Sequence, residues 1–154
     1  MPEAARIADQ LRRAFDGDAW HGDSVLEILQ SVTPEQAAAR PIPNAHTIWE
    51  LVLHIAAWDG AVLRRIGGDA ATLAEAENFP AVADASEIAW RSALAAARHV
   101  HEELVAAVAN LPDSRLDDIV PGKEGSHYTF YYLLQGVVQH ELYHAGQIAL
   151  LKKL

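Results

Sequence analysis

Helical spacing of apolar residues is the feature that most limits how this chain can fold. In four long stretches, apolar side chains recur every three or four residues, which gives a helix one apolar face. These stretches span residues 2–15, 47–67, 84–111 and 129–153. No stretch alternates apolar and polar residues as a half-buried strand does. The pattern predicts an all-α fold in which four helices pack as a four-helix bundle.

Capping signals mark where several of these helices begin and end. Thr47 and Glu50 have the spacing of a capping box, and a glycine pair beginning at Gly67 ends the same stretch. Asp84 and Glu87 repeat the capping-box spacing and predict the start of the third long helix. The second and third long helices are therefore well defined by sequence.

The connections between the long helices differ in length and content. A short helix is expected at about residues 33–39, and residues 24–32 form either another short helix or a kinked continuation of the first long helix. Residues 69–83 contain a proline and have weak periodicity. A connection of that length is interpreted as a crossover, which lets the third long helix start at the opposite end of the bundle.

Length and charge limit the kind of partner. The chain has 154 residues, the usual size of one domain, so residues 1–154 are expected to form a single domain. Its formal net charge is −9, and no basic stripe is present. Because nucleic-acid affinity comes largely from Lys and Arg that neutralise phosphates, we expect no nucleic-acid partner.

The absence of cysteine limits the chemistry. Disulfides, thiolate metal sites and a cysteine nucleophile are excluded, so any metal must use nitrogen and oxygen ligands. The first residues are charged at helical spacing and lack the apolar core of a signal peptide, and no uncharged apolar run reaches the length of a membrane span. A cytoplasmic protein without a membrane partner is expected.

Two histidines in the last helix indicate a metal site. His140 and His144 lie one turn apart, on the face that carries Leu133, Val137 and Ile148. A lone histidine on such a face is most often a core residue. Burying two imidazoles side by side leaves hydrogen bonds unmet at about 1–3 kcal/mol each, which a shared metal ion would avoid.

A catalytic ion usually takes three protein ligands and leaves one position open for water or substrate. His54, at the border of the apolar face of the second long helix, is the candidate third ligand. Imidazole suits zinc, nickel, copper and iron alike, so ligand type alone does not select the metal.

Glu141 lies between the two histidines and completes the pattern His-Glu-x-x-His of zinc proteases, in which the glutamate activates a metal-bound water. Such proteases take their third ligand from well downstream, whereas only ten residues follow His144 here. Glu141 lies about 100° around the helix from His140. It is therefore either a solvated surface residue or a catalytic acid or base.

Other residues near the candidate site have alternative interpretations. His101, on the core face of the third long helix, is a fourth ligand, a residue that orients a ligand, or a core histidine. Glu50 either orients His54 or serves only in its capping box. Tyr143 is a candidate to assist proton transfer. His46 is expected as a cap or at the rim of a pocket.

The histidine pattern resembles that of the DinB-like superfamily of four-helix metalloproteins. The matching motifs are Thr47 to Ala56, which contains His54, and the sequence from His140 to Ile148 with its His-Ala-Gly-Gln tail. The resemblance implies an up-down-down-up bundle with a long crossover between helices two and three. It also implies a divalent ion, zinc or nickel, on His54, His140 and His144, and a homodimer.

Characterised members of that superfamily include thiol-dependent transferases and an isomerase that use low-molecular-weight thiols such as bacillithiol or mycothiol. The resemblance therefore suggests a small-molecule substrate and a transferase or hydrolase. The alternative is a non-catalytic metal or small-ligand binding protein of stress response, in which the metal is structural. A metal-free bundle dimer is the third hypothesis. A count of the ligands separates the first two, because structural sites fill their coordination and catalytic sites stay open.

Overall fold

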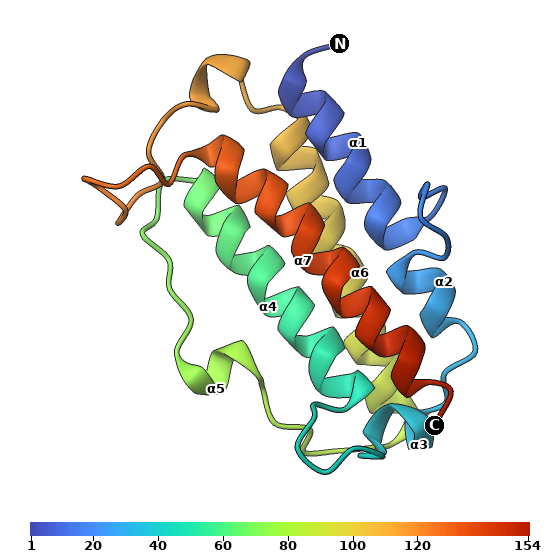
Figure 1. The fold of residues 1–154 in the computed structure, drawn as a ribbon. Coiled ribbons are helices and arrows are strands. Elements are labelled where there is room, and N and C mark those ends of the chain that lie inside the picture. The colour runs from blue at the N-terminus through green and yellow to red at the C-terminus, as the bar shows by residue number, and fades with distance from the viewer.

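Four long helices carry the fold of the computed structural model, which describes residues 1–154 (Figure 1). They are α1 (Glu3–Asp16), α4 (Ile48–Ile66), α6 (Glu87–Ala109) and α7 (Phe130–Leu151). The chain contains no strand, and its one β-pairing is an isolated bridge between Ile119 and Thr129. The predicted all-α class is confirmed. None of the helices combines the length and hydropathy needed to cross a bilayer.

Short helices occupy three of the connections. They are α2 (Val25–Leu29), α3 (Pro34–Ala38), α5 (Glu75–Asn78) and the 3-10 turn η1 (Asp113–Arg115). α2 is a separate helix rather than a continuation of α1, because positive φ angles at Gly17 (139°) and Asp18 (61°) turn the chain away at the end of α1. α5 was not predicted, because its four residues lie in a segment without helical periodicity.

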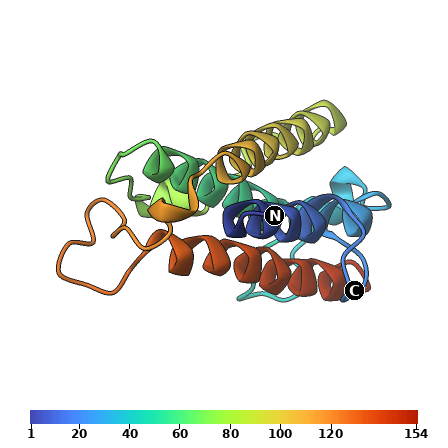
Figure 2. The same ribbon diagram turned by 90° about the horizontal axis from the view of Figure 1, so that it is seen from above.

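Each long helix packs against two others: α4 and α1 both contact α6 on one side and α7 on the other. Figure 2 shows α1 between α6 and α7. In Figure 1, α1 and α7 run downward and α4 and α6 run upward. The connection that carries α5 therefore follows the outside of the molecule from the top of α4 to the bottom of α6.

The predicted cap of α4 is present, and that of α6 is shifted. The Thr47 hydroxyl accepts from the Glu50 backbone N–H at 3.1 Å, and the Glu50 carboxylate accepts from the Thr47 N–H at 2.8 Å. The prediction that Asp84 caps α6 is wrong. The Asp84 carboxylate instead accepts from the N–H and hydroxyl of Ser86, and Ser86 caps the helix by accepting from the Ala89 N–H.

The apolar interior consists of two clusters that meet halfway along the bundle. Every long helix contributes residues to both clusters. On each helix, the boundary between the two clusters lies at the same height along the bundle. The residues on either side of that level are Leu11 and Phe15, Ile55 and Val62, Ala97 and Leu104, and Val137 and Ala145. Three of the helices place a buried polar residue in the gap: Asp59, His101 and Glu141.

Candidate metal centres

The structure brings His54, His140 and His144 together where α4 faces α7. The Nε2 atom of His140 lies 2.9 Å from Nε2 of His54 and 3.0 Å from Nε2 of His144. These three residues form a group whose ligand atoms all lie within 4.8 Å of one another. We call this group the histidine centre.

Hydrogen bonds on the far side of two rings fix which nitrogen faces the centre. The Nδ1–H of His54 donates to the carbonyl oxygen of Asn78 at 2.8 Å. The Nδ1–H of His144 donates to Oε1 of Gln147 at 2.6 Å. A neutral imidazole carries one N–H, so both rings present an Nε2 lone pair to His140.

The residues of the histidine centre fit a divalent cation. A single N–H on His140 could satisfy only one of the two lone pairs it meets, whereas a cation accepts all three nitrogens at once. Ligands held at about 2.1 Å from one ion lie about 3.0–3.4 Å from each other, close to the spacing observed here. No fourth carboxylate or imidazole belongs to the group, which leaves one coordination position open.

The surroundings keep the three rings uncharged. Burial lowers the pKa of His140 to about 3, and the repulsion that a proton on His144 or His54 would exert acts in the same direction. Burial also lowers the pKa of His54 and of His144, against the opposing hydrogen bonds from Asn78 and Gln147. Neutral imidazole is the form that binds metal, so protons compete little for these ligands at neutral pH.

The last residue of α5 and the residue that follows it support His54. The Phe79 ring stacks on that of His54 at a centroid distance of 4.0 Å, and His46 stacks on Phe79 at 3.7 Å. The Trp58 Nε1–H donates to the side-chain oxygen of Asn78 at 2.8 Å and so anchors the residue that orients His54. No sequence signal pointed to Asn78 or Phe79, because they lie in the segment of weak periodicity. His46 is exposed and contacts Phe79 and Glu50, and the cap of α4 is Thr47 rather than His46.

A cavity of about 370 Å³ opens beside His140. Three tyrosines contribute to its lining, so we call it the tyrosine-lined cavity. The residues that line it are Trp58, Val62, Tyr128, Tyr131, Tyr132, Leu133, Gln135, Gly136, Val137, Gln139 and His140. A small molecule in this cavity would lie against the only half-buried histidine of the centre.

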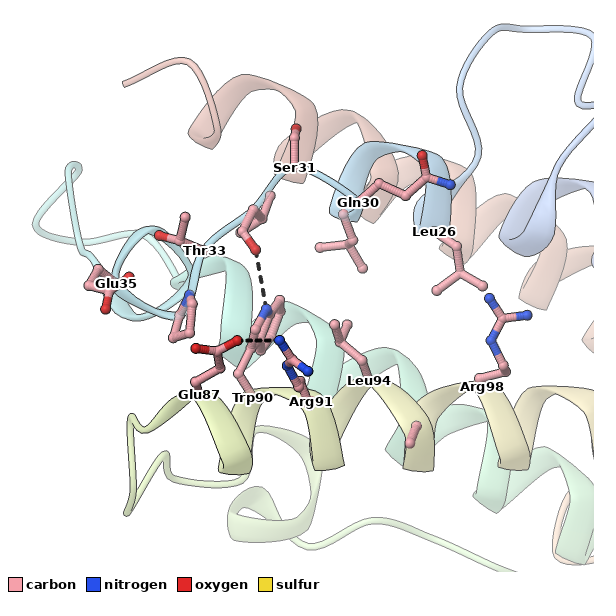
Figure 3. A pocket seen from close by; sticks show the side chains of 14 residues that line it. Leu26, Gln30, Ser31, Thr33, Glu35, Glu87, Trp90, Arg91, Leu94 and Arg98 are labelled. Carbon is pink, nitrogen blue, oxygen red and sulfur yellow. Dashed lines mark hydrogen bonds and ion pairs between the residues drawn. The ribbon is translucent and has the colours of Figure 1, made fainter.

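The largest cavity, about 710 Å³, lies elsewhere, between α6 and the segment of α2 and α3 (Figure 3). The Trp90 Nε1–H donates across it to the carbonyl oxygen of Val32 at 3.3 Å. Arg91 pairs with Glu87 along its α6 side. None of the three histidines lines this cavity, so its size does not connect it with the metal centre.

Two predicted accessory residues stand outside the histidine centre. The Glu50 carboxylate contacts Thr47, Arg40 and His46 but not His54, so the capping-box interpretation describes it. Tyr143 is 66% exposed, and its ring lies edge-on to that of His144 at 5.1 Å. Its hydroxyl has no hydrogen-bond partner within the chain.

A second group of metal-ligand residues lies in the gap between the two apolar clusters. Nδ1 of His101 is 3.0 Å from Oδ2 of Asp59 and 3.0 Å from Oε1 of Glu141. The side chains of His101, Asp59 and Glu141 are 3%, 0% and 0% exposed. We call this group the interior centre.

The interior centre corrects the interpretation of Glu141. The prediction that Glu141 is a solvated surface residue is wrong. Glu141 lies about 100° around the helix from His140, and that direction faces His101 of α6 rather than solvent. His101 is buried as predicted but belongs to this group rather than to the histidine centre. Asp59 was not predicted as a site residue. The only indication in the sequence was a single carboxylate between Ile55 and Val62 on the apolar face of α4.

Burial controls the charges of the interior centre. It raises the pKa of Asp59 and raises that of Glu141 to about 8, against the opposing hydrogen bond from His101. Burial alone would lower the pKa of His101, but the hydrogen bond to Asp59 and the charge of Glu141 outweigh it and raise that pKa to about 9. His101 and Glu141 therefore retain protons at neutral pH when no metal ion is bound, and the pKa of Asp59 is shifted in the same direction.

Comparison with known proteins places the chain in a family. The family model of the DinB superfamily matches residues 18–148, a range that includes α4, most of α7 and all three residues of the histidine centre. Comparison with curated proteins and with solved structures gave no significant match. Because the family match covers most of the sequence and both helices of the histidine centre, this chain belongs to the DinB superfamily.

Proposed function

We propose that this protein is a metal-dependent enzyme in which His54, His140 and His144 hold a divalent ion, zinc or nickel. The supporting fold is a single-domain, up-down-down-up four-helix bundle with its crossover between α4 and α6. The observation that carries the proposal is the pair of Nε2 lone pairs that His54 and His144 direct at His140, beside a cavity large enough for a small molecule.

The open position at the histidine centre favours an enzyme over a structural metal site. Structural sites fill their coordination with protein ligands, whereas three imidazoles leave a place for water or substrate. A divalent ion bound there would supply Lewis-acid chemistry, lowering the pKa of a water or a thiol that occupies the open position. A non-catalytic metal or small-ligand binding protein with a structural metal remains the alternative, and a fourth protein ligand would favour it.

The chain's own residues determine how a substrate would be held. Trp58, Tyr128 and Tyr132 line the cavity and provide an apolar surface that excludes water from the reacting group. His140 joins this surface to the metal site. Asn78 and Gln147 hold the other two rings at a fixed angle and tautomer, which pre-organises the site before a ligand arrives.

The cavity favours a small substrate with an apolar body. Its lining contains no aspartate, glutamate, lysine or arginine. One cation stands next to it, since Nζ of Lys123 lies 5.5 Å from the ring centroid of Tyr128. A low-molecular-weight thiol that carries a carboxylate would place that group near Lys123 and its sulfur near the metal site. We therefore propose thiol S-transfer, with hydrolysis as the second reaction type.

The test is an activity assay on protein purified without an affinity tag and loaded with zinc or nickel. Bacillithiol, mycothiol, glutathione and coenzyme A are each paired with an electrophilic acceptor, and ester substrates test hydrolysis. The reference is the triple variant His54→Ala, His140→Ala, His144→Ala. His99→Ala, which removes an exposed histidine of α6, is the matched control and should retain activity.

Turnover by the wild type and the control but not by the triple variant supports the proposal. Turnover equal to that of the triple variant with every thiol and ester contradicts it. If the wild type then binds one ion with four protein ligands, as X-ray absorption would show, the non-catalytic alternative replaces it.

A further inference from the structure

We propose a second divalent-cation site, formed by Asp59, His101 and Glu141 in the interior of the bundle. It is separate from the histidine centre and from the proposed reaction. Its ligands come one each from α4, α6 and α7, so an ion there would tie three of the four long helices together.

The geometry of the interior centre suits one ion. The Nδ1 atom of His101 is 3.0 Å from Oδ2 of Asp59 and 3.0 Å from Oε1 of Glu141. Ligands that share an ion at about 2.1 Å are about 3.0 Å apart when cis in an octahedron and about 3.4 Å apart in a tetrahedron. The carboxylates thus converge on the nitrogen at the separation that coordination to one ion produces.

Hydrogen bonding within the group leaves several buried atoms without a partner. The Nδ1–H of His101 donates to Asp59, and this is the only hydrogen bond of good geometry within the group. Oδ1 of Asp59 and both carboxylate oxygens of Glu141 have no hydrogen-bond partner, although both residues are 0% exposed. Buried oxygens are nearly always satisfied, and each one that is not costs about 1–3 kcal/mol. A cation coordinated by both carboxylates would remove this penalty for the oxygens that it binds, whereas Nε2 of His101, which also has no partner, would stay without one.

Charge balance points the same way. Two carboxylates and one imidazole make a group with a net charge of −2 when all are deprotonated, and a divalent cation neutralises it. No lysine or arginine contacts the group, so the chain offers no other permanent positive charge there. Buried charges in proteins are paired or coordinate metals.

The position in the core indicates that the site is built into the fold. The group lies between the two apolar clusters. At this height each of three helices carries a ligand residue where an apolar core residue would be expected. Phe15 of α1 closes the fourth side by stacking on His101 at 4.1 Å. Helix bundles commonly place metal ligands on facing helices in this way.

The donor set suggests the class of ion. One imidazole nitrogen and two carboxylate oxygens suit manganese, iron or zinc rather than a soft metal. Because the ligands are closed off from solvent, the ion would enter during folding, exchange slowly and stabilise the structure. This behaviour differs from that expected at the open histidine centre.

The experiment counts ions in the triple variant His54→Ala, His140→Ala, His144→Ala, which removes the histidine centre and leaves the interior centre intact. The untagged protein is produced with added manganese or zinc, passed through a chelating column and measured by elemental analysis. We expect two ions per chain in the wild type, one in the triple variant, and none when Asp59→Asn and Glu141→Gln are added. Glu102→Gln, an exposed neighbour of His101, is the matched control and should keep the ion.

A folded triple variant that contains no ion overturns the proposal, and the three side chains are then a proton-sharing hydrogen-bond network. An ion that persists after Asp59→Asn and Glu141→Gln also overturns it. Should the combined variant fail to fold, X-ray absorption on the triple variant decides: one imidazole among oxygen ligands supports the site, and any other ligand set contradicts it. The wild-type activity assay reports separately on the histidine centre.

Discussion

The histidine centre and the interior centre are built from the same helices but have opposite access to solvent. In both, one imidazole nitrogen lies about 3 Å from two other ligand-type atoms, and neighbouring residues of α7, His140 and Glu141, supply one ligand to each centre. His140 lines an open cavity, whereas Glu141 is 0% exposed. One residue step on a helix therefore separates a site suited to chemistry from one suited to stability.

The two centres also differ in how their ligands are supported. In the histidine centre, Asn78 and Gln147 satisfy the outer nitrogens of two rings. In the interior centre, carboxylate oxygens have no such partner. The first arrangement is pre-organised for a ligand that comes and goes, and the second depends on whatever cation or proton occupies it. Five experiments would break or sharpen this contrast.

Substitution of His101 should have the largest effect on stability. His101→Ala leaves two buried carboxylates facing each other without the imidazole between them, and breaking such a buried pair costs about 3–5 kcal/mol. Urea unfolding followed by circular dichroism measures the change in the free energy of unfolding. A loss below about 1 kcal/mol would show that the interior centre does not hold the helices together.

Substitution of His140 should affect activity and leave the fold intact. His140→Ala removes a half-buried ligand of the histidine centre, so the metal-dependent turnover should fall by about 100-fold or more. The midpoint of urea unfolding of the metal-free protein should change little. Loss of stability as large as that of His101→Ala would contradict the division of roles between the centres.

Acid should destabilise the metal-free protein through the histidine centre. The folded pKa of His140 is about 3, below its ordinary value of 6.5, so between these values the unfolded chain binds a proton that the folded protein does not. The free energy of unfolding should therefore fall as the pH drops from about 6.5 towards 3. The triple histidine-to-alanine variant should show a smaller fall, and an equal one would refute the attribution.

Alkali should act on the metal-free protein through the interior centre. Glu141 has a folded pKa of about 8 against 4.5, and His101 one of about 9 against 6.5, so the folded protein holds protons that the unfolded chain has released. Stability should fall as the pH rises through these ranges. Glu141→Gln cannot lose that proton, so its decline should be shallower, as thermal melting at several pH values would show.

The smallest effect is expected at Trp58. Trp58→Phe keeps the ring but removes the N–H that donates to Asn78, a hydrogen bond worth about 0.5–1.5 kcal/mol. Because Asn78 orients His54, metal affinity at the histidine centre should weaken by about 2-fold to 10-fold. Competition with a coloured chelator measures it. An unchanged affinity would mean that His54 is positioned without help from the connection.

The sequence was sufficient to predict the elements whose signals are local. Helical periodicity and the Thr47 capping box predicted α4, and the spacing of His140 and His144 predicted one shared face. Their meeting with His54 followed from two helices whose apolar faces must pack together.

The interior centre and the support of His54 were beyond such reasoning. Asp59 is one carboxylate on an apolar helix, and its partners come from α6 and α7 at distances of 42 and 82 residues along the chain. Which residues share a level depends on the relative shift of packed helices, which periodicity does not give. Asn78 ends the four-residue α5 and Phe79 follows it, in a stretch of sequence without helical periodicity where no spacing predicts a contact.

The stacking of Phe79 on His54 ties the long outer connection to the metal ligand. A cation on Nε2 would draw electron density from the imidazole and strengthen the bond that its Nδ1–H donates to Asn78. Occupancy of the histidine centre should then hold residues 69–83 more firmly against α4. Limited proteolysis would follow this directly: cleavage within that segment should be fast in chelator and slow once metal is restored.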